Sequence, residues 1–263
     1  MLKLTGVTKT FFPGTVNERR ALNLDHLELA AGEFVTVIGS NGAGKSTLLN
    51  MVSGKLTPDT GTVEIDGKDV TKLPDHRRAG LIGRVFQDPM ASTAPDLTIE
   101  QNLSIALTRG QRRGLGPGVT NARRARFREE LTQLEQGLEN RLSAKVGLLS
   151  GGQRQALSLL MATFSEPRVL LLDEHTAALD PSRADLVVRL TKSLVELHTP
   201  TTLMVTHNMD QALGLGDRLI MMHEGRVVVD IAGEKKKNAT VKDLLAAFED
   251  VKGAELSDRS LLG

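Results

Sequence analysis

The sequence of 263 residues contains no cysteine, no tryptophan and no tyrosine, so its seven phenylalanines are its only members of the Phe, Trp and Tyr group. The absence of cysteine excludes a disulfide scaffold, a thiolate metal site and a cysteine nucleophile. The absence of tryptophan and tyrosine excludes a platform of those rings for stacking nucleobases. Any base that this chain stacks must therefore lie against phenylalanine, histidine or arginine.

Long apolar runs and a large excess of one charge are also missing. The longest purely apolar stretches, such as residues 169–172 and 219–222, are far shorter than the roughly 20 residues that span a bilayer. The 33 basic and 32 acidic side chains leave a formal net charge of +1, so nucleic acid is not an expected partner. Residues 1–12 alternate polar and apolar side chains and lack a signal peptide's apolar core, which predicts a strand and a cytoplasmic location.

Short apolar segments alternate with helical patterns along much of the chain. This alternation predicts an α/β fold with a mostly parallel sheet and helices on both of its faces. From residue 88 to residue 148 the pattern is helical, beginning with a capping box formed by Thr98 and Gln101. The predicted strands are residues 34–38, 63–65, 85–86, 169–172 and 201–206; the predicted helices are residues 46–52, 98–108, 153–164, 181–197 and 241–249; and a turn between two strands is predicted at residues 223–226.

A glycine-rich segment between the strand at 34–38 and the helix at 46–52 matches the P-loop (Walker A) pattern G-x-x-x-x-G-K-S. Its glycines let successive backbone N–H groups converge on phosphate oxygens at a helix N-terminus, while Lys45 adds a positive charge and the Ser46 hydroxyl can bind Mg²⁺. The segment therefore predicts a site for a nucleoside triphosphate and Mg²⁺. The expected ligand contacts are Gly39, Ser40, Asn41, Gly42, Ala43, Gly44, Lys45, Ser46 and Thr47.

Two carboxylates, Asp173 and Glu174, directly follow the apolar strand at 169–172. Ligands of open α/β sheets bind beyond the carboxyl ends of the strands, where both side chains are expected. We expect Asp173 to hold Mg²⁺ through water, and Glu174 to orient or deprotonate the water that attacks the γ-phosphate. The sequence therefore predicts hydrolysis of the bound nucleotide.

A second glycine-rich segment, Leu149-Ser150-Gly151-Gly152-Gln153, opens another helix and offers a second anion site. This segment and the P-loop occur together with five further polar residues at strand ends and helix starts: Gln87, Asp173, Glu174, Asp180 and His207. In the order and context of these motifs, residues 2–226 resemble the ATP-binding subunit of ATP-binding cassette (ABC) transporters. The resemblance implies the P-loop NTPase fold of ABC type, with an added N-terminal antiparallel β subdomain and an inserted helical subdomain.

The resemblance also implies how the chain is divided. Residues 1–263 form a single ABC ATPase domain. Within it, residues 1–87 and 149–230 make the RecA-like core with its antiparallel β subdomain. Residues 88–148 make the helical signature subdomain, and residues 231–263 make a C-terminal helix and tail.

Four residues look like the signature motif of the family: Ser150, Gly151, Gly152 and Gln153. In ABC ATPases this motif grips the γ-phosphate of an ATP bound to the P-loop of a second copy. The resemblance therefore implies a head-to-tail homodimer that sandwiches two ATP molecules. Asp180 is implied as a contact to the partner chain, and it also stands as N-cap before Pro181 at the first turn of the helix at 181–197.

The remaining catalytic residues are implied by their positions in the family's motifs. Gln87 resembles the residue that contacts Mg²⁺ and the attacking water, and His207 resembles the switch histidine that contacts the γ-phosphate. Together with Lys45 and Glu174 they form the expected catalytic set. His175 stands where the family most often has proline; it either tunes the neighbouring site or faces solvent, and we favour the second.

The implied partners are a second copy of the chain, integral membrane permease subunits and, indirectly, a solute-binding lipoprotein, with the chain held peripherally at the cytoplasmic face of the cell membrane. The segments from Gln87 to Pro95 and from Asp173 to Ala178 look like a bacterial importer branch, some members of which handle aromatic amino acids. The alternative is a soluble ABC ATPase that does assembly or mechanical work, for example in iron–sulfur cluster assembly.

ABC ATPases usually stack adenine on a tyrosine upstream of the P-loop, and this chain has none. Phe11, which follows Thr8-Lys9-Thr10, occupies the matching place. If the N-terminal strand continues, Phe12 points to the opposite face, into the core. We therefore predict Phe11 as the stacking residue, in preference to Phe12.

Overall fold

The computed structural model describes residues 1–111, 114 and 116–250, and it contains two β-sheets. The first sheet is antiparallel, with the strand order β2-β1-β4-β5. The second has the order β10-β9-β3-β8-β7-β6, and only its edge strand β10 runs antiparallel to its neighbour among the strands described. The strands are β1 (Leu2–Phe11), β2 (Arg19–Leu29), β3 (Phe34–Gly39), β4 (Thr60–Ile65), β5 (Lys68–Asp69), β6 (Ile82–Val85), β7 (Val169–Asp173), β8 (Thr201–Val205), β9 (Arg218–His223) and β10 (Arg226–Ala232).

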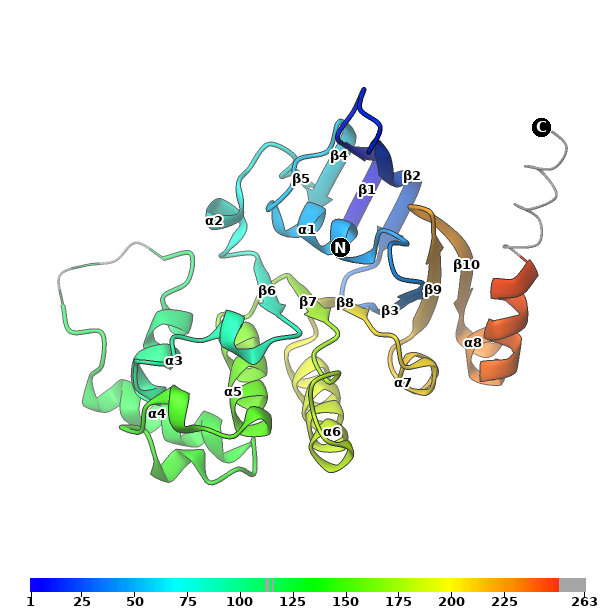
Figure 1. Cartoon of the computed structure of the whole chain (residues 1–263). Coiled ribbons are helices and arrows are strands. Elements are labelled where there is room, and N and C mark those ends of the chain that lie inside the picture. The colour runs from blue at the N-terminus through cyan, green and yellow to red at the C-terminus, as the bar shows by residue number, and fades with distance from the viewer. Residues whose placement is uncertain (112–113, 115, 251–263) are drawn as a thin grey trace, which may run out of the picture.

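Helices cover both faces of the six-stranded sheet. Helices α5 and α6 lie on the side away from the four-stranded sheet, and α3 and α4 lie beyond α5 (Figure 1). Across the described parts of the chain, no helix has both the length and the apolar character needed to cross a bilayer. The helices are α1 (Lys45–Ser53), α2 (Asp75–Arg78), α3 (Ile99–Leu107), α4 (Asn121–Thr132), α5 (Gly151–Thr163), α6 (Pro181–His198), α7 (Met209–Gly214) and α8 (Gly233–Asn238), with 3₁₀ turns at Pro89–Ser92, Leu138–Asn140 and Val146–Leu148 and a helical segment at 241–250.

Strand β7 shows why the parallel strands are apolar throughout. Leu170 and Leu172 pack into the cluster formed with α5 and α6, whereas Val169 and Leu171 pack into the cluster on the opposite face. All four side chains are fully buried. Because successive side chains of a strand point to opposite faces, a strand covered on both sides must be apolar at every position. The predicted mostly parallel α/β sheet is confirmed.

Helix α1 is held between the two sheets. Its apolar residues Leu48, Leu49 and Val52 share one buried cluster with β1 and β4 of the first sheet and with β3, β7 and β8 of the second. Burying a leucine side chain contributes roughly 1.5–3 kcal/mol. Both sheets therefore fix the position of α1, including its N-terminus, where the glycine-rich loop ends.

The region between β6 and α5 is helical, as predicted. Thr98 caps α3 in a capping box with Gln101, in which each side chain accepts a hydrogen bond from the other residue's backbone N–H. The apolar residues at three- and four-residue spacing are all fully buried: Phe127, Leu131, Leu134 and Leu138. Of these, Leu134 and Leu138 lie beyond the end of α4. The Phe127 ring lies 5.8 Å from the Phe164 ring just after α5, which joins α4 to that helix.

The C-terminal elements agree with the predictions, whereas one N-terminal strand was missed. Residues 223–226 form the predicted turn between β9 and β10, and the predicted C-terminal helix extends over 241–250. The predicted tail includes residues 251–263, which lie outside the described residues, as do residues 112–113 and 115 of the predicted helical subdomain. Strand β2 was not predicted as a segment, although it supplies the antiparallel partner of β1.

Candidate active site

The glycine-rich loop connects the end of β3 to the start of α1, and two glycines in it cannot be replaced. Gly39 has φ 148°, and a Cβ there would lie 2.2 Å from the Met222 carbonyl oxygen. Gly44 has φ 101°, and a Cβ there would lie 2.4 Å from the Ala21 carbonyl oxygen. Among the residues that the structure describes, no side chain caps α1, and its first turn contains no acidic residue. Its N–H groups therefore remain available to an anion, as the P-loop pattern predicts.

Lys45 turns its ammonium group back into this loop. Its Nζ donates hydrogen bonds to the carbonyl oxygens of Gly39 (2.7 Å) and Ser40 (3.0 Å). Burial lowers the pKa of Lys45, whereas the nearby carboxylates of Glu174 and Asp173 raise it. The structure thus places the predicted phosphate-binding cation next to both predicted carboxylates.

Glu174 and His207 meet at the carboxyl ends of β7 and β8. Glu174 leaves the strand in a left-handed conformation with φ 46°, and its backbone N–H donates to the Val205 carbonyl oxygen at 2.9 Å. His207 Nδ1 lies 3.4 Å from Glu174 Oε2. Glu174 also lines a cavity of about 190 Å³ with Lys45, Ser46 and Thr47. One cavity therefore contains the phosphate cradle and the proposed base.

Asp173 is oriented by a residue that was not predicted for the site. Arg84 on β6 donates from Nη2 to Asp173 Oδ2 at 2.9 Å and from Nη1 to Asn50 Oδ1 on α1 at 2.8 Å. Its guanidinium also stacks on the Phe86 ring, 4.5 Å from the centroid. Arg84 lies in β6 but precedes the predicted strand at 85–86, so the sequence pattern gave no sign of these contacts. Within the residues that the structure describes, Asp173 Oδ1 has no hydrogen-bond partner and remains available.

Phe11 lines the same cavity, whereas Phe12 does not. The prediction that Phe12 lies in the core is wrong: its side chain is 67% exposed. The physical reason is that β1 ends at Phe11 and Phe12 takes φ 53°, so the alternation of faces stops between the two residues. The position of Phe11 next to the phosphate cradle agrees with its predicted stacking role.

Replacing Phe11 with alanine tests this role. Stacking of a base on an aromatic ring contributes about 1–3 kcal/mol, so we expect Phe11→Ala to weaken ATP binding roughly 5- to 150-fold. Equilibrium titration with ATP measures the change, and Phe12→Ala is the matched control because the neighbouring ring is exposed. If Phe12→Ala loses the affinity and Phe11→Ala keeps it, the assignment of the stacking residue is wrong.

Ser150 to Gln153 form the N-terminus of α5 and lie apart from the phosphate cradle. The Ser150 hydroxyl accepts a hydrogen bond from the Gln153 N–H, and Gln153 Oε1 accepts one from the Ser150 N–H, which makes a capping box. None of the four signature residues is among the described residues that line the cavity at the cradle. A single chain therefore does not bring the two predicted phosphate-binding segments together.

Two other predicted residues lie at element ends. Gln87 is exposed, two residues after the end of β6. Asp180 is the N-cap of α6 with Pro181 at the first helical position, as predicted: its Oδ1 accepts from the Arg183 N–H at 3.2 Å. Hydrogen bonds, first of all from the Ser182 hydroxyl, lower the pKa of Asp180, so this carboxylate is ionised at neutral pH.

His175 does not face solvent, which corrects the sequence-based expectation. Its side chain is only 1% exposed, because α6 covers it, and Nε2 lies 2.9 Å from Thr191 Oγ1. The Thr191 hydroxyl donates its single hydrogen to the Val187 carbonyl oxygen, so His175 Nε2 must be the donor in this pair. Burial lowers the pKa of His175 to about 4, which leaves the imidazole neutral.

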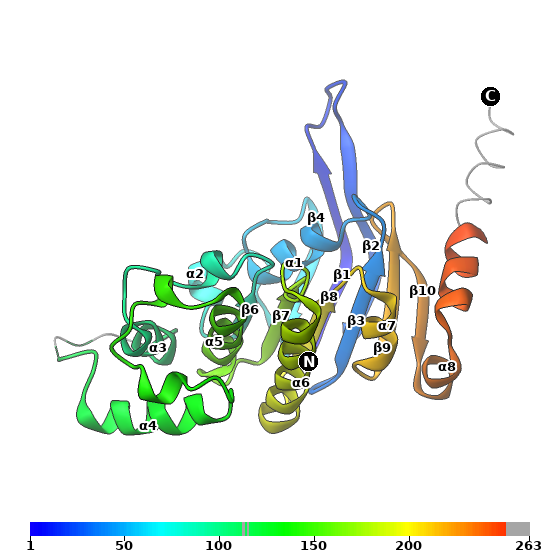
Figure 2. The same ribbon diagram turned by 60° about the horizontal axis from the view of Figure 1, so that its bottom comes forward.

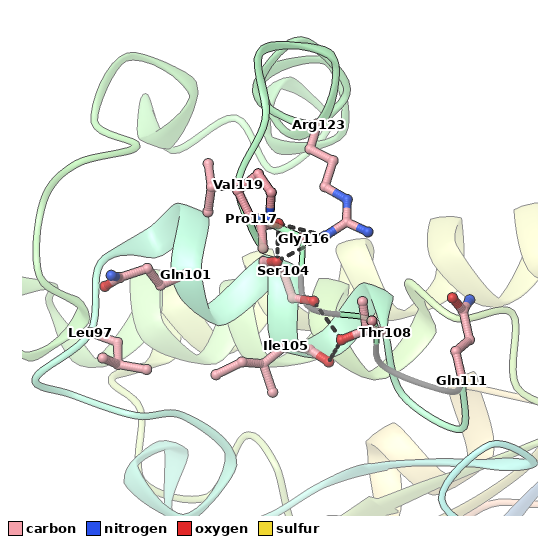
Figure 3. A pocket seen from close by; sticks show the side chains of 12 residues that line it. Leu97, Gln101, Ser104, Ile105, Thr108, Gln111, Gly116, Pro117, Val119 and Arg123 are labelled. Carbon is pink, nitrogen blue, oxygen red and sulfur yellow. Dashed lines mark hydrogen bonds between the residues drawn. The ribbon is translucent and has the colours of Figure 1, made fainter.

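A larger cavity of about 630 Å³ lies between α3 and the start of α4 (Figure 3). The polar side chains around it already bind their own chain: Ser104 and Arg123 both donate to the Gly118 carbonyl oxygen, and the Thr108 hydroxyl donates to the Ser104 carbonyl oxygen. No carboxylate and no predicted site residue is among the described residues that line it. We therefore place the chemistry in the smaller cavity at the phosphate cradle.

Comparison with known proteins gives consistent matches. The family model described as ABC transporter matches residues 22–177. The tyrosine transport ATP-binding protein of Clostridioides difficile (strain R20291) is 42% identical over 254 residues, which cover 95% of this chain and 99% of that protein. The methionine import ATP-binding protein MetN of Brucella abortus (strain 2308) is 36% identical over 216 residues, which cover 80% of this chain and 55% of that protein. A solved dimeric structure of the ATP-binding cassette MJ0796, in a post-hydrolysis state bound to ADP and Pi, matches with a TM-score of 0.75 and 33% identity over 88% of this chain and 98% of that chain.

Proposed function

The chain belongs to the ABC transporter family as an ATP-binding and ATP-hydrolysing subunit, and we propose that it drives the import of an amino acid through separate membrane subunits. The single observation that supports the choice of solute is the 42% identity, over nearly the full length of both chains, to a tyrosine transport ATP-binding protein. The relatives also include a methionine import ATP-binding protein.

The nucleotide lies in the cavity formed by Phe11, the P-loop and Glu174. Backbone N–H groups at the start of α1 and the Lys45 ammonium hold its phosphates, and Phe11 stacks on the adenine. Glu174 accepts the proton of the attacking water. His207, 3.4 Å from the Glu174 carboxylate, keeps that side chain oriented and contacts the γ-phosphate.

Magnesium fits the donor set at this site. The Ser46 hydroxyl, the Gln87 amide oxygen and the free Asp173 Oδ1 are oxygen donors of the kind that Mg²⁺ prefers. In the described residues, no group of three or more His, Cys, Asp or Glu side chains could form a metal site made by protein alone. Mg²⁺ held by Ser46, Gln87 and Asp173 would neutralise charge on the nucleotide phosphates.

A second copy of the chain completes the site. The signature residues at the N-terminus of α5 face the γ-phosphate of the ATP held in the partner's cradle, and Asp180 at the N-terminus of α6 contacts the partner beside it. The solved dimer of the related cassette MJ0796 supports a dimeric state. ATP therefore stabilises the closed dimer only through contacts that the open form lacks, chiefly this second grip on the γ-phosphate.

The remaining partners are permease subunits at the cytoplasmic face of the cell membrane, with a solute-binding lipoprotein acting through them. Residues 88–148 form the helical subdomain that receives a coupling helix of the permease, next to Gln87. Residues 1–87 and 149–230 form the core that binds ATP, and residues 231–263 form the C-terminal extension.

Purification and uptake together test this function. We expect a tagged chain to co-purify with a multi-span membrane protein, and we expect cells that carry Glu174→Gln to lose uptake of labelled tyrosine or another amino acid. Purification without a membrane protein would favour the soluble ABC ATPase instead. Unchanged uptake of all amino acids, with the membrane partner present, would reject the solute class but leave the transporter subunit in place.

A further inference from the structure

Arg19 stands at the edge of the nucleotide cavity without a predicted role. It begins β2, and across the β1–β2 hairpin its Cα partner is Phe11. This hairpin extends beyond the rest of the molecule (Figure 2). Arg19 lines the same cavity as Phe11, Lys45 and Glu174. The side chain thus lines the cavity together with the predicted stacking residue and the phosphate cradle.

The Arg19 guanidinium is attached to the P-loop itself. Its Nη2 donates to the Gly42 carbonyl oxygen at 2.6 Å. Gly42 has φ 83°, and a Cβ there would lie 2.1 Å from Arg19 Nη2, so a side chain at that position would displace the guanidinium. Since an arginine offers five N–H donors in a planar fork, one bond to Gly42 leaves the others for a ligand.

The positive charge of Arg19 is not neutralised by its surroundings. No carboxylate lies within 4.0 Å of its guanidinium among the described residues, and the neighbouring Glu18 carboxylate accepts from the Gly14 N–H instead. Glu174 is the single carboxylate among the described lining residues, against the two cations Lys45 and Arg19. This excess of positive charge suits a polyphosphate.

We propose that Arg19 is a second cationic ligand of the nucleotide phosphates, which holds the Gly42 peptide with one N–H and the phosphate chain with the others. The proposal rests on the proposed ATP site and adds to it a residue outside the P-loop, on the adjoining sheet. It predicts that the contribution of Arg19 to binding affinity increases with the number of phosphates on the nucleotide, because the electrostatic attraction grows with ligand charge.

Affinities for ATP, ADP and AMP, measured by displacement of a fluorescent ATP analogue, test this role. We expect Arg19→Ala to weaken ATP roughly 3- to 10-fold and ADP less, to change AMP less than about twofold, and to lose most of its effect in about 1 M salt. Arg20→Ala is the matched control, because Arg20 is the adjacent arginine and donates to Asn23 Oδ1 at 2.7 Å instead. Both side chains are exposed, so neither variant threatens folding.

Three results would overturn the proposal. The first is unchanged ATP affinity in Arg19→Ala. The second is a loss of AMP affinity in Arg19→Ala as large as the loss of ATP affinity, which would indicate displacement of Phe11; the third is an equal loss of ATP affinity in Arg20→Ala, which would indicate an effect of the hairpin's overall charge. Lys45→Ala separates this proposal from the one on which it rests. If Lys45→Ala leaves ATP binding intact, the ATP site itself is wrong. If Lys45→Ala abolishes binding while Arg19→Ala has no effect, only the role of Arg19 is wrong.

Discussion

Glu174→Gln is expected to reduce steady-state ATP hydrolysis at least about 100-fold while ATP binding persists. A positioned general base typically contributes 10²- to 10⁴-fold to a rate, and the glutamine amide cannot accept the proton of the attacking water. The substitution keeps the size of the side chain, and the Glu174 backbone stays tied to Val205. The bound ATP should therefore remain uncleaved in an otherwise intact site.

Phosphate release at saturating ATP measures this loss, and Glu166→Gln is the matched control. Glu166 has φ 49°, close to the φ 46° of Glu174, and it lines a different cavity. The same chemical change in the same backbone conformation is expected to leave the rate unaltered there. A Glu174→Gln chain that hydrolyses ATP at the unmodified rate would remove Glu174 from the mechanism.

Gly151→Asp is expected to lower hydrolysis about 100-fold or more without weakening the isolated chain. Of the described residues, a Cβ at Gly151 would meet the Leu179 side chain alone, at 3.9 Å, which is an ordinary contact. The first turn of α5 has no acidic residue, and a carboxylate there interacts favourably with the helix dipole. In the proposed dimer, however, the same carboxylate would face the partner's γ-phosphate, and like charges placed against each other at interfaces cost several kcal/mol.

The combination of readouts distinguishes this effect from damage to the fold. The melting temperature of Gly151→Asp should be equal to or above that of the unmodified chain, and ADP affinity should be unchanged, because Gly151 does not line the cavity at the cradle. Gly152→Ala is a useful contrast, since its Cβ would lie 2.9 Å from Arg183 Cδ and the Arg183 side chain of the same chain would have to shift. Normal hydrolysis by Gly151→Asp would reject the signature role of this helix.

The parts of the fold that sequence predicted well are those decided by local pattern. Strand β7 could be predicted because it is buried on both faces and reads as a continuous apolar run. The cap of α3 could be predicted because Thr98 stands three residues before Gln101. The same spacing of Ser150 and Gln153 caps α5, which was predicted to begin only at residue 153. The P-loop could be predicted because its glycines occupy backbone conformations that other residues rarely adopt.

The parts that were missed depend on distant contacts or on broken periodicity. Strand β2 buries Leu22 and Leu24 and then Leu27 and Leu29, so its apolar period shifts in mid-strand. His175 is buried by a helix that only tertiary packing places over it. Whether Phe12 is buried depends on where β1 ends. That end is set by the β1–β2 hairpin and not by the Phe11 and Phe12 side chains.

The sequence named the candidate site residues one by one, but it did not name the contacts that support them. Arg84 is far in sequence from Asp173 and comes near it because β6 pairs with β7. Arg19 is close in sequence to Phe11 and comes to lie across from it because β2 pairs with β1. An arginine side chain is ordinarily solvated, so the sequence context of these two arginines gives no sign of a site. Their roles could be inferred only from hydrogen bonds to Asp173 and Gly42.

The central claim is that the ATP site is completed by a second copy of the chain, and the molar mass of Glu174→Gln in solution tests it most directly. By light scattering, we expect this 28.4 kDa chain to double its mass with ATP and Mg²⁺, and to remain a monomer with ADP. Adding Gly151→Asp to the same chain should keep it monomeric even with ATP. If Glu174→Gln stays monomeric with saturating ATP, or if it forms the same dimer when Gly151→Asp is added, the two-chain site is contradicted.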